Sequence, residues 1–443
     1  MSKPFIVVQG PVATRSGYGN HTRDLVTALI NADKYEVKVV SLPWGNCPMN
    51  ALETGNKDHD NISKVIARDN ITQQPDVFIQ VSVPNEFQNV GKYNIGVTAG
   101  IETTAVSPEF IQGANKMDLL VTTSKHSAKG FLDIVYDAVD QKTGEKSPDK
   151  QLKFEKTSEV LFEGLDLNVY NKTTEIAPNV KDELDAIPNS FCYLFVGHWL
   201  RGSIGQDRKD IGMMIKTFCE TFRRKSKHNR PALVLKTSSA TFSIMDRDAI
   251  TAKIQSIVAP YGDNAIDIYL LHGDLTDYEM NSLYNHPKMK AMVSFTKGEG
   301  FGRPLLEYSI TGKPVIASNW SGHIDFLNKD FCTLLPGKLN QVHESAADKF
   351  ILKESQWFTV DYNYASQVLQ DVTKNYKTYL TKSRKQTQYV KDNFSLDLMA
   401  DKFCKLVDKG LENVPQQVSL NLPKLKKSSK DSAMLSLPKL KKV

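Results

Sequence analysis

The sequence predicts an α/β protein with two facing Rossmann-like domains, a C-terminal crossover helix and a disordered tail. Short apolar runs alternate with segments of helical periodicity, which is typical of βαβ units with a parallel sheet. This cycle occurs twice, before and after a polar, turn-rich stretch at residues 171–190. A chain of 443 residues is also long enough for two domains of ordinary size.

The first domain is expected at residues 1–175. Continuous apolar runs there have the character of strands buried on both faces: residues 4–9, 35–42, 75–83, 93–99 and 118–124. Helical spacing at residues 21–32 and 127–135 predicts connecting helices.

The second domain is expected at residues 190–380. Its predicted strands are residues 192–199, 231–238, 266–273, 290–295 and 314–319, and residues 210–224 have the pattern of a helix. Parallel sheets of this kind bind ligands beyond the carboxyl ends of their strands, so the expected binding site is the cleft between the domains.

C-terminal helices at residues 381–412 are expected to pack back across the cleft, with the last helix beginning at Ser395. The remaining residues, 413–443, contain the sequence LPKLKK twice, at 422–427 and 437–442. A segment rich in Lys and Pro and poor in aromatic residues is predicted to be disordered. The tail is either a solubilising appendage, or its two repeats dock a protein or an anionic partner such as DNA.

Charge and cysteine content limit the classes of function. The tail carries seven lysines and one aspartate, which account for the formal net charge of +6, so the other 412 residues are formally neutral. Because these residues are neutral in total, the composition gives no support for a surface that binds duplex DNA. The five cysteines are scattered singly, which suits a reducing compartment, and no signal peptide or membrane span is indicated. A cytoplasmic protein is expected.

The stretch KGEGFGRPLLEYSITGKPVIAS carries the clearest chemistry in the chain. Glu299 is expected in a loop at the carboxyl end of a strand, and Glu307 about one turn into the following helix. The amides of Gly300, Phe301 and Gly302 lie before that helix, where a phosphate or a sugar hydroxyl is favoured. Carboxylates accept hydrogen bonds in pairs, so Glu307 suits a ribose diol and Glu299 the hydroxyls of a second ring.

This stretch resembles the signature of retaining glycosyltransferases of the GT-B fold, in which two Glu residues flank a Gly-Phe-Gly and are separated by seven residues. The matching residues are Glu299, Gly300, Phe301, Gly302, Pro304, Leu306 and Glu307. The resemblance implies that Glu299 holds the donor sugar, Glu307 the nucleotide ribose, and the loop amides the sugar and the diphosphate.

Residues 195–218 are similar to the first strand, loop and helix of the family's donor domain, where an Arg and a Lys bind the diphosphate. Lys209 matches the Lys and is a predicted catalytic residue. His198 stands at the position of the Arg, and Arg201 or Arg208 is a candidate for the missing charge. Two cations are needed because the departing diphosphate must be stabilised.

Two segments of the first domain complete the predicted site. Gly17, Tyr18 and Gly19 match a glycine-rich loop that borders the acceptor and the diphosphate in the family. Glu102 lies in a stretch that resembles the acceptor-domain loop of the family and is the third predicted catalytic residue. The alternative for Glu102 is a helix cap.

The resemblance implies transfer from a nucleotide-diphosphate sugar with retention of anomeric configuration and without a metal or other cofactor. Two Asp-x-Asp stretches, at 58–60 and 246–248, have the spacing of metal-dependent transferases but neither clearly ends a buried strand. Two other classes stay open. One is a non-catalytic nucleotide-sugar or glycan binding protein on a transferase fold, and the other is a glycoside hydrolase.

The acceptor is not determined by the sequence. The stretches TKGEGFGRPLLE and SGHIDFL are similar to transferases of tailed bacteriophages and marine bacteria. A phage enzyme would act in the host cytoplasm. Hydroxymethylated DNA bases would then be one acceptor class, and a base buried in a duplex would have to be flipped out to reach the site. Glycan and protein acceptors are equally open.

Overall fold

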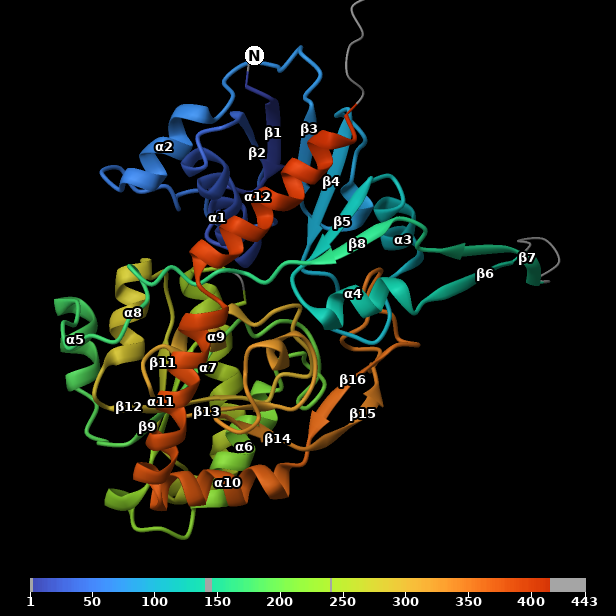
Figure 1. Cartoon of the computed structure of the whole chain (residues 1–443). Coiled ribbons are helices and arrows are strands. Elements are labelled where there is room, and N and C mark those ends of the chain that lie inside the picture. Colours follow the sequence, from blue (N-terminus) through green and yellow to red (C-terminus); the bar gives the residue numbers. More distant parts are fainter. Residues whose placement is uncertain (1–2, 140–145, 240, 415–443) are drawn as a thin grey trace, which may run out of the picture.

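The computed structural model describes residues 3–139, 146–239 and 241–414 and contains two α/β domains, one above the other in Figure 1. The upper domain, coloured blue to cyan, holds the first sheet, and the lower domain, green to orange, holds the second. The predicted pair of Rossmann-like domains is confirmed.

The first sheet has six parallel strands in the order β2-β1-β3-β4-β5-β8. Its strands are β1 (Phe5–Gly10), β2 (Glu36–Ser41), β3 (Val77–Val81), β4 (Tyr93–Thr98), β5 (Leu119–Thr122) and β8 (Thr157–Val160). Its helices are α1 (Gly17–Asn31), α2 (Lys57–Val65), α3 (Pro108–Ala114) and α4 (Lys125–Leu132), with a 3-10 turn η1 (Pro84–Glu86).

The second sheet has six parallel strands in the order β11-β10-β9-β12-β13-β14. These are β9 (Cys192–Val196), β10 (Ala232–Lys236), β11 (Ile268–Leu271), β12 (Met289–Ser294), β13 (Val315–Ser318) and β14 (Thr333–Leu335). Helices α6 (Ile211–Phe222), α7 (Ile244–Val258), α8 (Asp277–Asn285) and α9 (Arg303–Ser309) connect them, with 3-10 turns η2 (Lys227–Asn229), η3 (Ala259–Asn264) and η4 (Gly322–Asp325). The strand order reverses between β9 and β12, which is where such sheets bind ligands.

The central strands of both sheets are buried on both faces, as their continuous apolar runs predict. In β5, Leu119 and Val121 pack into one hydrophobic cluster and Leu120 into another. In β10, Val234 and Leu235 are likewise divided between two clusters. Successive side chains of a strand point to opposite faces, so each sheet has apolar packing on each side.

Several predicted boundaries differ from the structure. Helix α1 begins at Gly17 and not at residue 21, because Ser16 caps it by accepting a hydrogen bond from the Gly19 amide (3.0 Å). The polar stretch at 171–190 contains a helix, α5 (Pro178–Asp185), which buries Val180 and Leu184. That apolar pair at i and i+4 is too short a pattern to stand out in a polar segment.

Two hairpins were not predicted. Strands β6 (Val135–Val139) and β7 (Lys146–Lys153) project from the first domain, and β15 (Gly337–Gln341) pairs with β16 (Gln356–Val360) in the second (Figure 1). The second hairpin reaches the other domain, since the Thr104 amide donates to the carbonyl of Gln356 (2.8 Å).

The C-terminal part consists of α10 (Tyr362–Lys374), α11 (Tyr376–Asn393) and α12 (Leu396–Glu412). Helix α11 lies along the second domain and begins ahead of the predicted boundary at residue 381, while α12 crosses onto the first domain (Figure 1). The predicted cap is confirmed, since Ser395 Oγ accepts from the Leu398 amide (3.4 Å). Disorder was predicted for residues 413–443, which contain the two LPKLKK repeats. Residues 415–443 lie outside the part of the chain that the structure describes.

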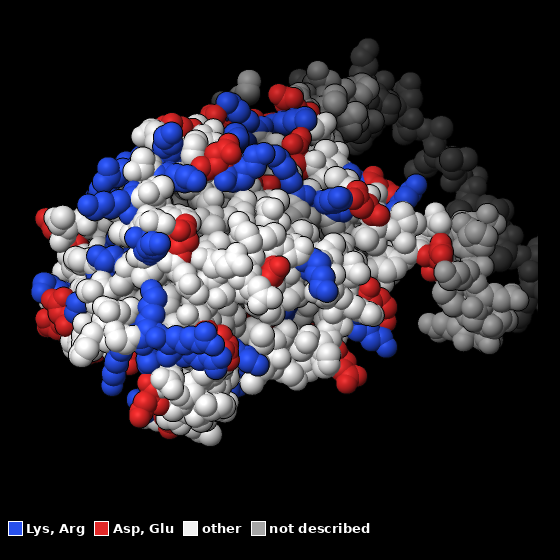
Figure 2. Space-filling view, turned by 90° about the horizontal axis from the view of Figure 1, so that it is seen from below, with Lys and Arg blue, Asp and Glu red and all other residues white. Residues whose placement is uncertain are grey.

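On the face seen from below, Lys and Arg side chains are mixed with Asp and Glu towards the edge, and the centre is largely uncharged (Figure 2). The described residues thus form no continuous basic surface on this face. Of the cysteines, Cys192 and Cys219 are buried and the other three are partly exposed. Among the described helices, none combines the length and the apolar character that crossing a bilayer requires.

Candidate functional site

A cavity of about 360 Å³ lies between the two domains, next to loops that follow β4, β9 and β12. This volume is within the range of small-molecule sites. Of the predicted site residues, the following line the cavity: Gly17, Glu102, His198, Arg208, Lys209, Glu299, Gly300, Phe301, Gly302 and Glu307. Tyr18, Gly19 and Arg201 are not among the lining residues.

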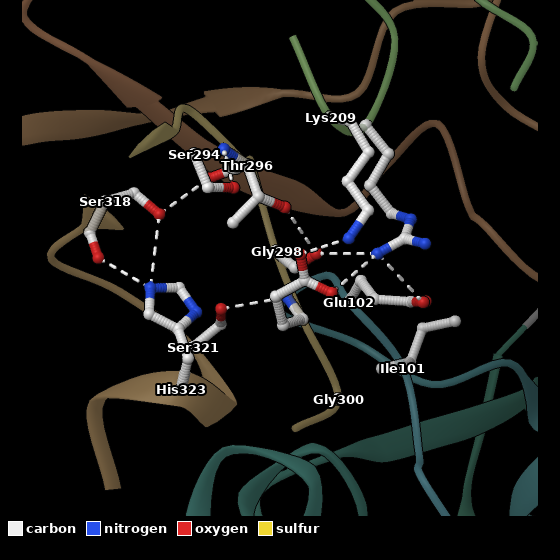
Figure 3. Close-up of polar contacts among 12 residues, drawn as sticks. Ile101, Glu102, Lys209, Ser294, Thr296, Gly298, Gly300, Ser318, Ser321 and His323 are labelled. Atoms are coloured by element: carbon white, nitrogen blue, oxygen red, sulfur yellow. Dashed lines mark hydrogen bonds and ion pairs between the residues drawn. The ribbon is translucent and has the colours of Figure 1, made fainter. Parts of the chain in front are cut away.

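Glu299 lies at one end of the cavity, in the loop between β12 and α9, and the segment after β13 holds its backbone. Its amide donates to Ser321 Oγ (2.9 Å), and its carbonyl accepts from the Gly322 amide (2.9 Å). Its Oε1 pairs with Lys209 Nζ, and its Oε2 lies 3.2 Å from Arg208 Nη1. Figure 3 shows Lys209, from the second domain, approaching this loop.

Two opposing effects set the charge of Glu299. Burial by itself would raise the pKa of this carboxyl, but the adjacent Lys209 and Arg208 outweigh burial and lower the pKa to about 2. Glu299 is therefore ionised at neutral pH, and each cation has the carboxylate as its partner.

The loop that carries Arg208 and Lys209 is tied to the Glu299 loop from behind. The amide of Lys297 donates to the carbonyl of Arg208 (2.7 Å). The fully buried Nζ of Lys297 lies 3.2 Å from Oδ2 of Asp210. Asp210 has a left-handed backbone (φ 54°) and also accepts from the hydroxyl of Tyr362 (2.6 Å). The two loops thus hold each other in register, and a buried Lys–Asp pair forms the joint.

Glu307 lies at the other end of the cavity, one turn into α9. Tyr284 donates its hydroxyl to Oε2 (2.8 Å), and Arg303 donates Nε to Oε1 (3.1 Å). Burial raises the pKa of Glu307 to about 7, although Arg303 and the Tyr284 hydrogen bond oppose this shift. Arg303 also pairs with Asp24 of the first domain (2.6 Å), so this end of the site spans both domains.

Glu102 reaches the Glu299 end from the first domain, in the loop after β4 (Figure 3). Its Oε1 lies 3.4 Å from Arg208 Nη1. A Cβ on Gly298 would lie 1.8 Å from the carbonyl oxygen of Glu102, and one on Gly300 would lie 2.4 Å from that of Ala99. These glycines are required by the contact between the domain loops, a reason that the sequence did not suggest.

The structure distinguishes the candidate cations. His198 Nδ1 lies 3.2 Å from Ser238 Oγ, and burial, followed by the nearby Lys209 and Arg208, lowers the pKa of His198 to about 4. His198 is therefore neutral at pH 7 in the ligand-free site. Arg201 pairs with Asp348 on the surface, away from the cavity. Arg208 is the second cation at the site, because it is the candidate that the loop turns towards Glu299.

The predicted glycine-rich loop is instead the first turn of α1. Gly17 lines the cavity, but Tyr18 is partly buried and its hydroxyl shares a hydrogen bond with Thr98 Oγ1 (3.0 Å). A Cβ on Gly19 would lie 2.2 Å from the carbonyl oxygen of Thr14, so this glycine permits the chain to approach itself and not a ligand.

Sequence reasoning missed several lining residues, among them Arg303, Tyr284, Glu163 and Arg15. Arg303 was expected in the loop before the helix, but it is the first residue of α9 and precedes Glu307 by four positions, so the two side chains share a face. The others come from segments far apart in the chain and carry no local signal.

The two Asp-x-Asp stretches do not line the cavity. Asp58 and Asp60 lie in the first turn of α2, and Asp246 accepts from the Ser239 amide (3.0 Å). Within residues 3–139, 146–239 and 241–414, no three His, Cys, Asp or Glu side chains are grouped as a metal site requires. Metal independence of the reaction stays a prediction.

The sequence matches no protein-family model, and no curated protein is similar enough to count as a match. Similarity appears with solved structures. A glycosyltransferase from Rickettsia africae superposes with a TM-score of 0.59 at 14% identity, covering 93% of this chain and 100% of that one. Sucrose-phosphate synthase from Thermosynechococcus elongatus gives 0.61 at 13% identity, covering 92% and 99%. HepE from Anabaena, solved with UDP-glucose, gives 0.56 at 10% identity, covering 91% and 99%.

These structures cover nearly the whole length of both chains, so the two domains and their arrangement are shared and not only one sheet. The chain has the GT-B fold, as its Gly-Phe-Gly stretch suggested. At identities of 10–14% the likeness extends to the fold, and what this chain does has to be argued from its own site.

Proposed function

We propose that this protein is a glycosyltransferase that moves a sugar from a nucleotide-diphosphate sugar to an acceptor, with retention of anomeric configuration and without a metal. One observation carries the proposal. Glu299 and Glu307 line one cavity of about 360 Å³ together with two adjacent cations, Arg208 and Lys209. A nucleotide sugar has the matching sequence of groups: sugar hydroxyls, a diphosphate and a ribose.

Each group of the donor has a partner of suitable chemistry. The ribose diol donates to the carboxylate of Glu307, and the diphosphate takes Lys209 and Arg208 as counter-ions. The sugar hydroxyls bind Glu299, whose two cations would turn to the arriving diphosphate. The amides of Gly300, Phe301 and Gly302 precede α9 and add donors for the diphosphate and the sugar.

The reaction follows from this placement. The bond between the anomeric carbon and the diphosphate oxygen breaks, and the acceptor oxygen bonds to the same face of the anomeric carbon. The acceptor proton passes to the departing diphosphate, so no carboxylate has to act as nucleophile. Arg208 and Lys209 stabilise the charge of the leaving group, and Glu102 is in reach of Arg208 on the acceptor side.

The known structures support the donor class without defining it. HepE of Anabaena, which shares this fold, was solved with UDP-glucose and with UDP. For the present chain, UDP-sugars are therefore the first donors to test, followed by GDP- and ADP-sugars.

The test is a thermal-shift panel of nucleoside diphosphates and their sugars, followed by product analysis with the donor that binds. A nucleotide that binds the native state raises its melting temperature. The proposal predicts a shift with at least one nucleotide and an α-linked product from an α-linked donor. Binding without transfer to any acceptor would favour a binding protein, and cleavage of simple glycosides would favour a hydrolase.

The acceptor is proposed as a class and not as a compound. If the chain is phage-encoded, as two of its stretches suggest, it acts in the host cytoplasm and hydroxymethylated DNA is one acceptor. Glycans and proteins are the others. Acceptor screening with and without residues 415–443 would show whether the lysine-rich repeats recruit an anionic or a protein acceptor.

A further inference from the structure

Glu163 lies in the segment after β8, which is fixed where the two domains and the C-terminal helices meet. The amide of Leu165 donates to the carbonyl of Phe394 (2.9 Å), and the amide of Leu396 donates to the carbonyl of Leu165 (2.8 Å). A Cβ on Gly164 would lie 2.6 Å from Cα of Leu396. The backbone next to Glu163 is thus packed against the α11–α12 junction, which fixes where this residue enters the cavity lining.

Glu163 lines the cavity, and its carboxyl group accepts no hydrogen bond from the part of the chain that the structure describes. Its residue is 6% exposed, and its Oε2 is buried without a donor among the described residues. The nearest cationic atom is Nη1 of Arg303, at 3.8 Å, which is beyond hydrogen-bond distance. A buried polar atom of this kind requires a partner, and a ligand in the cavity could supply one.

The charges around Glu163 are unbalanced. Arg303 is shared by three carboxyl groups, since it also pairs with Asp24 (2.6 Å) and Glu307 (3.1 Å). The charged groups that act on Glu163 are Arg303 and Glu307 of α9, Asp24 of α1 and Glu299 of the loop before α9. From α12, Lys402 approaches the ring of the neighbouring Phe162 (4.8 Å).

One guanidinium cannot neutralise three carboxylates, and like charges favour protonation of one of them. Burial raises the pKa of Glu163, Arg303 opposes this, and Asp24, Glu307 and Glu299 add to the rise, which brings the pKa to about 8. Within this cluster, Glu163 is the carboxyl that most favours the protonated form at neutral pH, because no donor among the described residues bonds to it, whereas Glu307 and Asp24 accept from Arg303.

We propose that Glu163 is a further ligand-binding residue of this site, which as a neutral carboxylic acid donates a hydrogen bond to the ribose of a bound nucleoside diphosphate and whose ionisation weakens binding. The inference rests on the proposed function, in which Glu307 accepts from the same ribose. Each ribose hydroxyl is both donor and acceptor, so a neutral acid beside a carboxylate complements the diol. An ionised Glu163 would instead add negative charge beside the diphosphate.

The test measures the affinity of UDP, GDP and ADP by calorimetry between pH 6.5 and pH 9 for three proteins: the unmodified chain, Glu163→Gln and the control Glu155→Gln. Glu155 is an exposed residue of the same region, just before β8. If only the form with protonated Glu163 and ionised Glu307 binds, the unmodified chain and the control lose about fivefold in affinity from pH 7 to pH 9, because the loss of about tenfold from Glu163 is offset about twofold by ionisation of Glu307. The Glu163→Gln variant keeps only the Glu307 effect and is expected to gain about twofold over this range. Ionisation of a nucleobase would affect all three proteins alike.

Two results would overturn the inference. Parallel pH profiles for all three proteins would show that Glu163 does not control binding. Loss of nucleotide binding at pH 7 in a natively folded Glu163→Gln variant would show that Glu163 acts as an ionised acceptor.

A ligand-free measurement separates this inference from the proposed function. Because folding raises the pKa of Glu163, the free energy of unfolding of the protein falls as pH rises from about 4.5 towards 8. The melting temperature of Glu163→Gln relative to the unmodified chain should therefore increase from pH 5 to pH 9. If no nucleotide binds but this increase occurs, the proposed function fails while Glu163 is still a buried neutral acid. A difference that is independent of pH would refute the neutral acid itself.

Discussion

Glu299 and Glu307 are the same residue type in one short stretch of chain, both buried and both lining one cavity, yet their environments differ. Glu299 faces two cations, Lys209 and Arg208, and its pKa falls to about 2. Glu307 shares a single Arg303 with other carboxyl groups, and its pKa rises to about 7. The difference is the number of cations for each carboxylate, because burial acts on both in the same direction.

This contrast suggests different work for the two ends of the cavity. At the Glu299 end the cations are placed where the charge of a leaving diphosphate develops, so changes there should reduce turnover. At the Glu307 end the groups are suited to holding a ribose, so changes there should reduce donor affinity. Five measurements test that division.

The largest effect is expected for Glu299→Gln. The substitution keeps the shape but removes the charge that orients Arg208 and Lys209, and loss of such preorganised groups costs about 10²–10³-fold in kcat. Single-turnover transfer measures it, and circular dichroism checks that the fold is intact. Glutamine is preferred to alanine because its amide oxygen can still accept a hydrogen bond from Lys209 or Arg208. Alanine would leave both buried cations without a partner, which destabilises a protein by about 3–5 kcal/mol. Unchanged kcat would refute the assignment of this end to catalysis.

Arg208→Gln should follow, with Arg201→Gln as its matched control. Arg208 lies in the cavity, and a charge-assisted bond to a diphosphate contributes about 2 kcal/mol, or roughly thirtyfold in kcat/KM. Arg201 is half-exposed and pairs with Asp348, so its substitution should change kcat/KM less than about twofold. Equal losses in both variants would mean that the loop as a whole, and not Arg208, supplies the charge.

Glu307→Gln should weaken donor binding by about 1.4 kcal/mol, or tenfold, because a neutral amide replaces a carboxylate acceptor. The loss is expected in the Kd of the nucleotide, measured by calorimetry, while kcat at saturating donor changes little. A fall in kcat equal to that of Glu299→Gln would remove the distinction between the two ends.

The two ends should also differ in pH dependence. Glu307 accepts from the ribose as a carboxylate, so donor affinity should rise about sixfold from pH 6 to pH 7.5: its ionisation adds about eightfold, and partial ionisation of Glu163 takes some of this away. Its raised pKa also means that the ligand-free protein loses stability from about pH 4.5 to pH 7, where the native state gives up its proton. Glu299, with its lowered pKa, contributes stability that is lost only as pH falls towards 2. A rise that persists in Glu307→Gln would assign it to another group.

The smallest effect is expected for Tyr284→Phe. Its hydroxyl donates to Glu307 (2.8 Å), and removing one such bond costs about 0.7 kcal/mol, which is about threefold in donor Kd. No change in kcat is expected, because Tyr284 does not contact the Glu299 end. A selective loss of kcat would show that the two ends are coupled.

Local patterns explain most of what the sequence predicted. Strands such as β5 and β10 were recognisable because strands buried on both faces appear in the sequence as short, continuous apolar runs. Glu299 and Glu307 were recognisable because a Gly-Phe-Gly turn and Pro304 fix where the loop ends and the helix begins. The start of α1 was wrong because two glycines obscured a helix that Ser16 caps.

The sequence by itself determined two parallel sheets, the helix after the Gly-Phe-Gly turn and the ends of strands at which Glu299, Glu307 and Lys209 lie. These follow from periodicity and turn chemistry, which act over a few residues. Tertiary structure alone decided which cation meets Glu299, why Gly298 and Gly300 are glycines, and where Glu163 and Arg303 lie. Those outcomes depend on distances between residues far apart in the chain and on the burial that shifts their pKa values, and neither quantity is written in a local pattern.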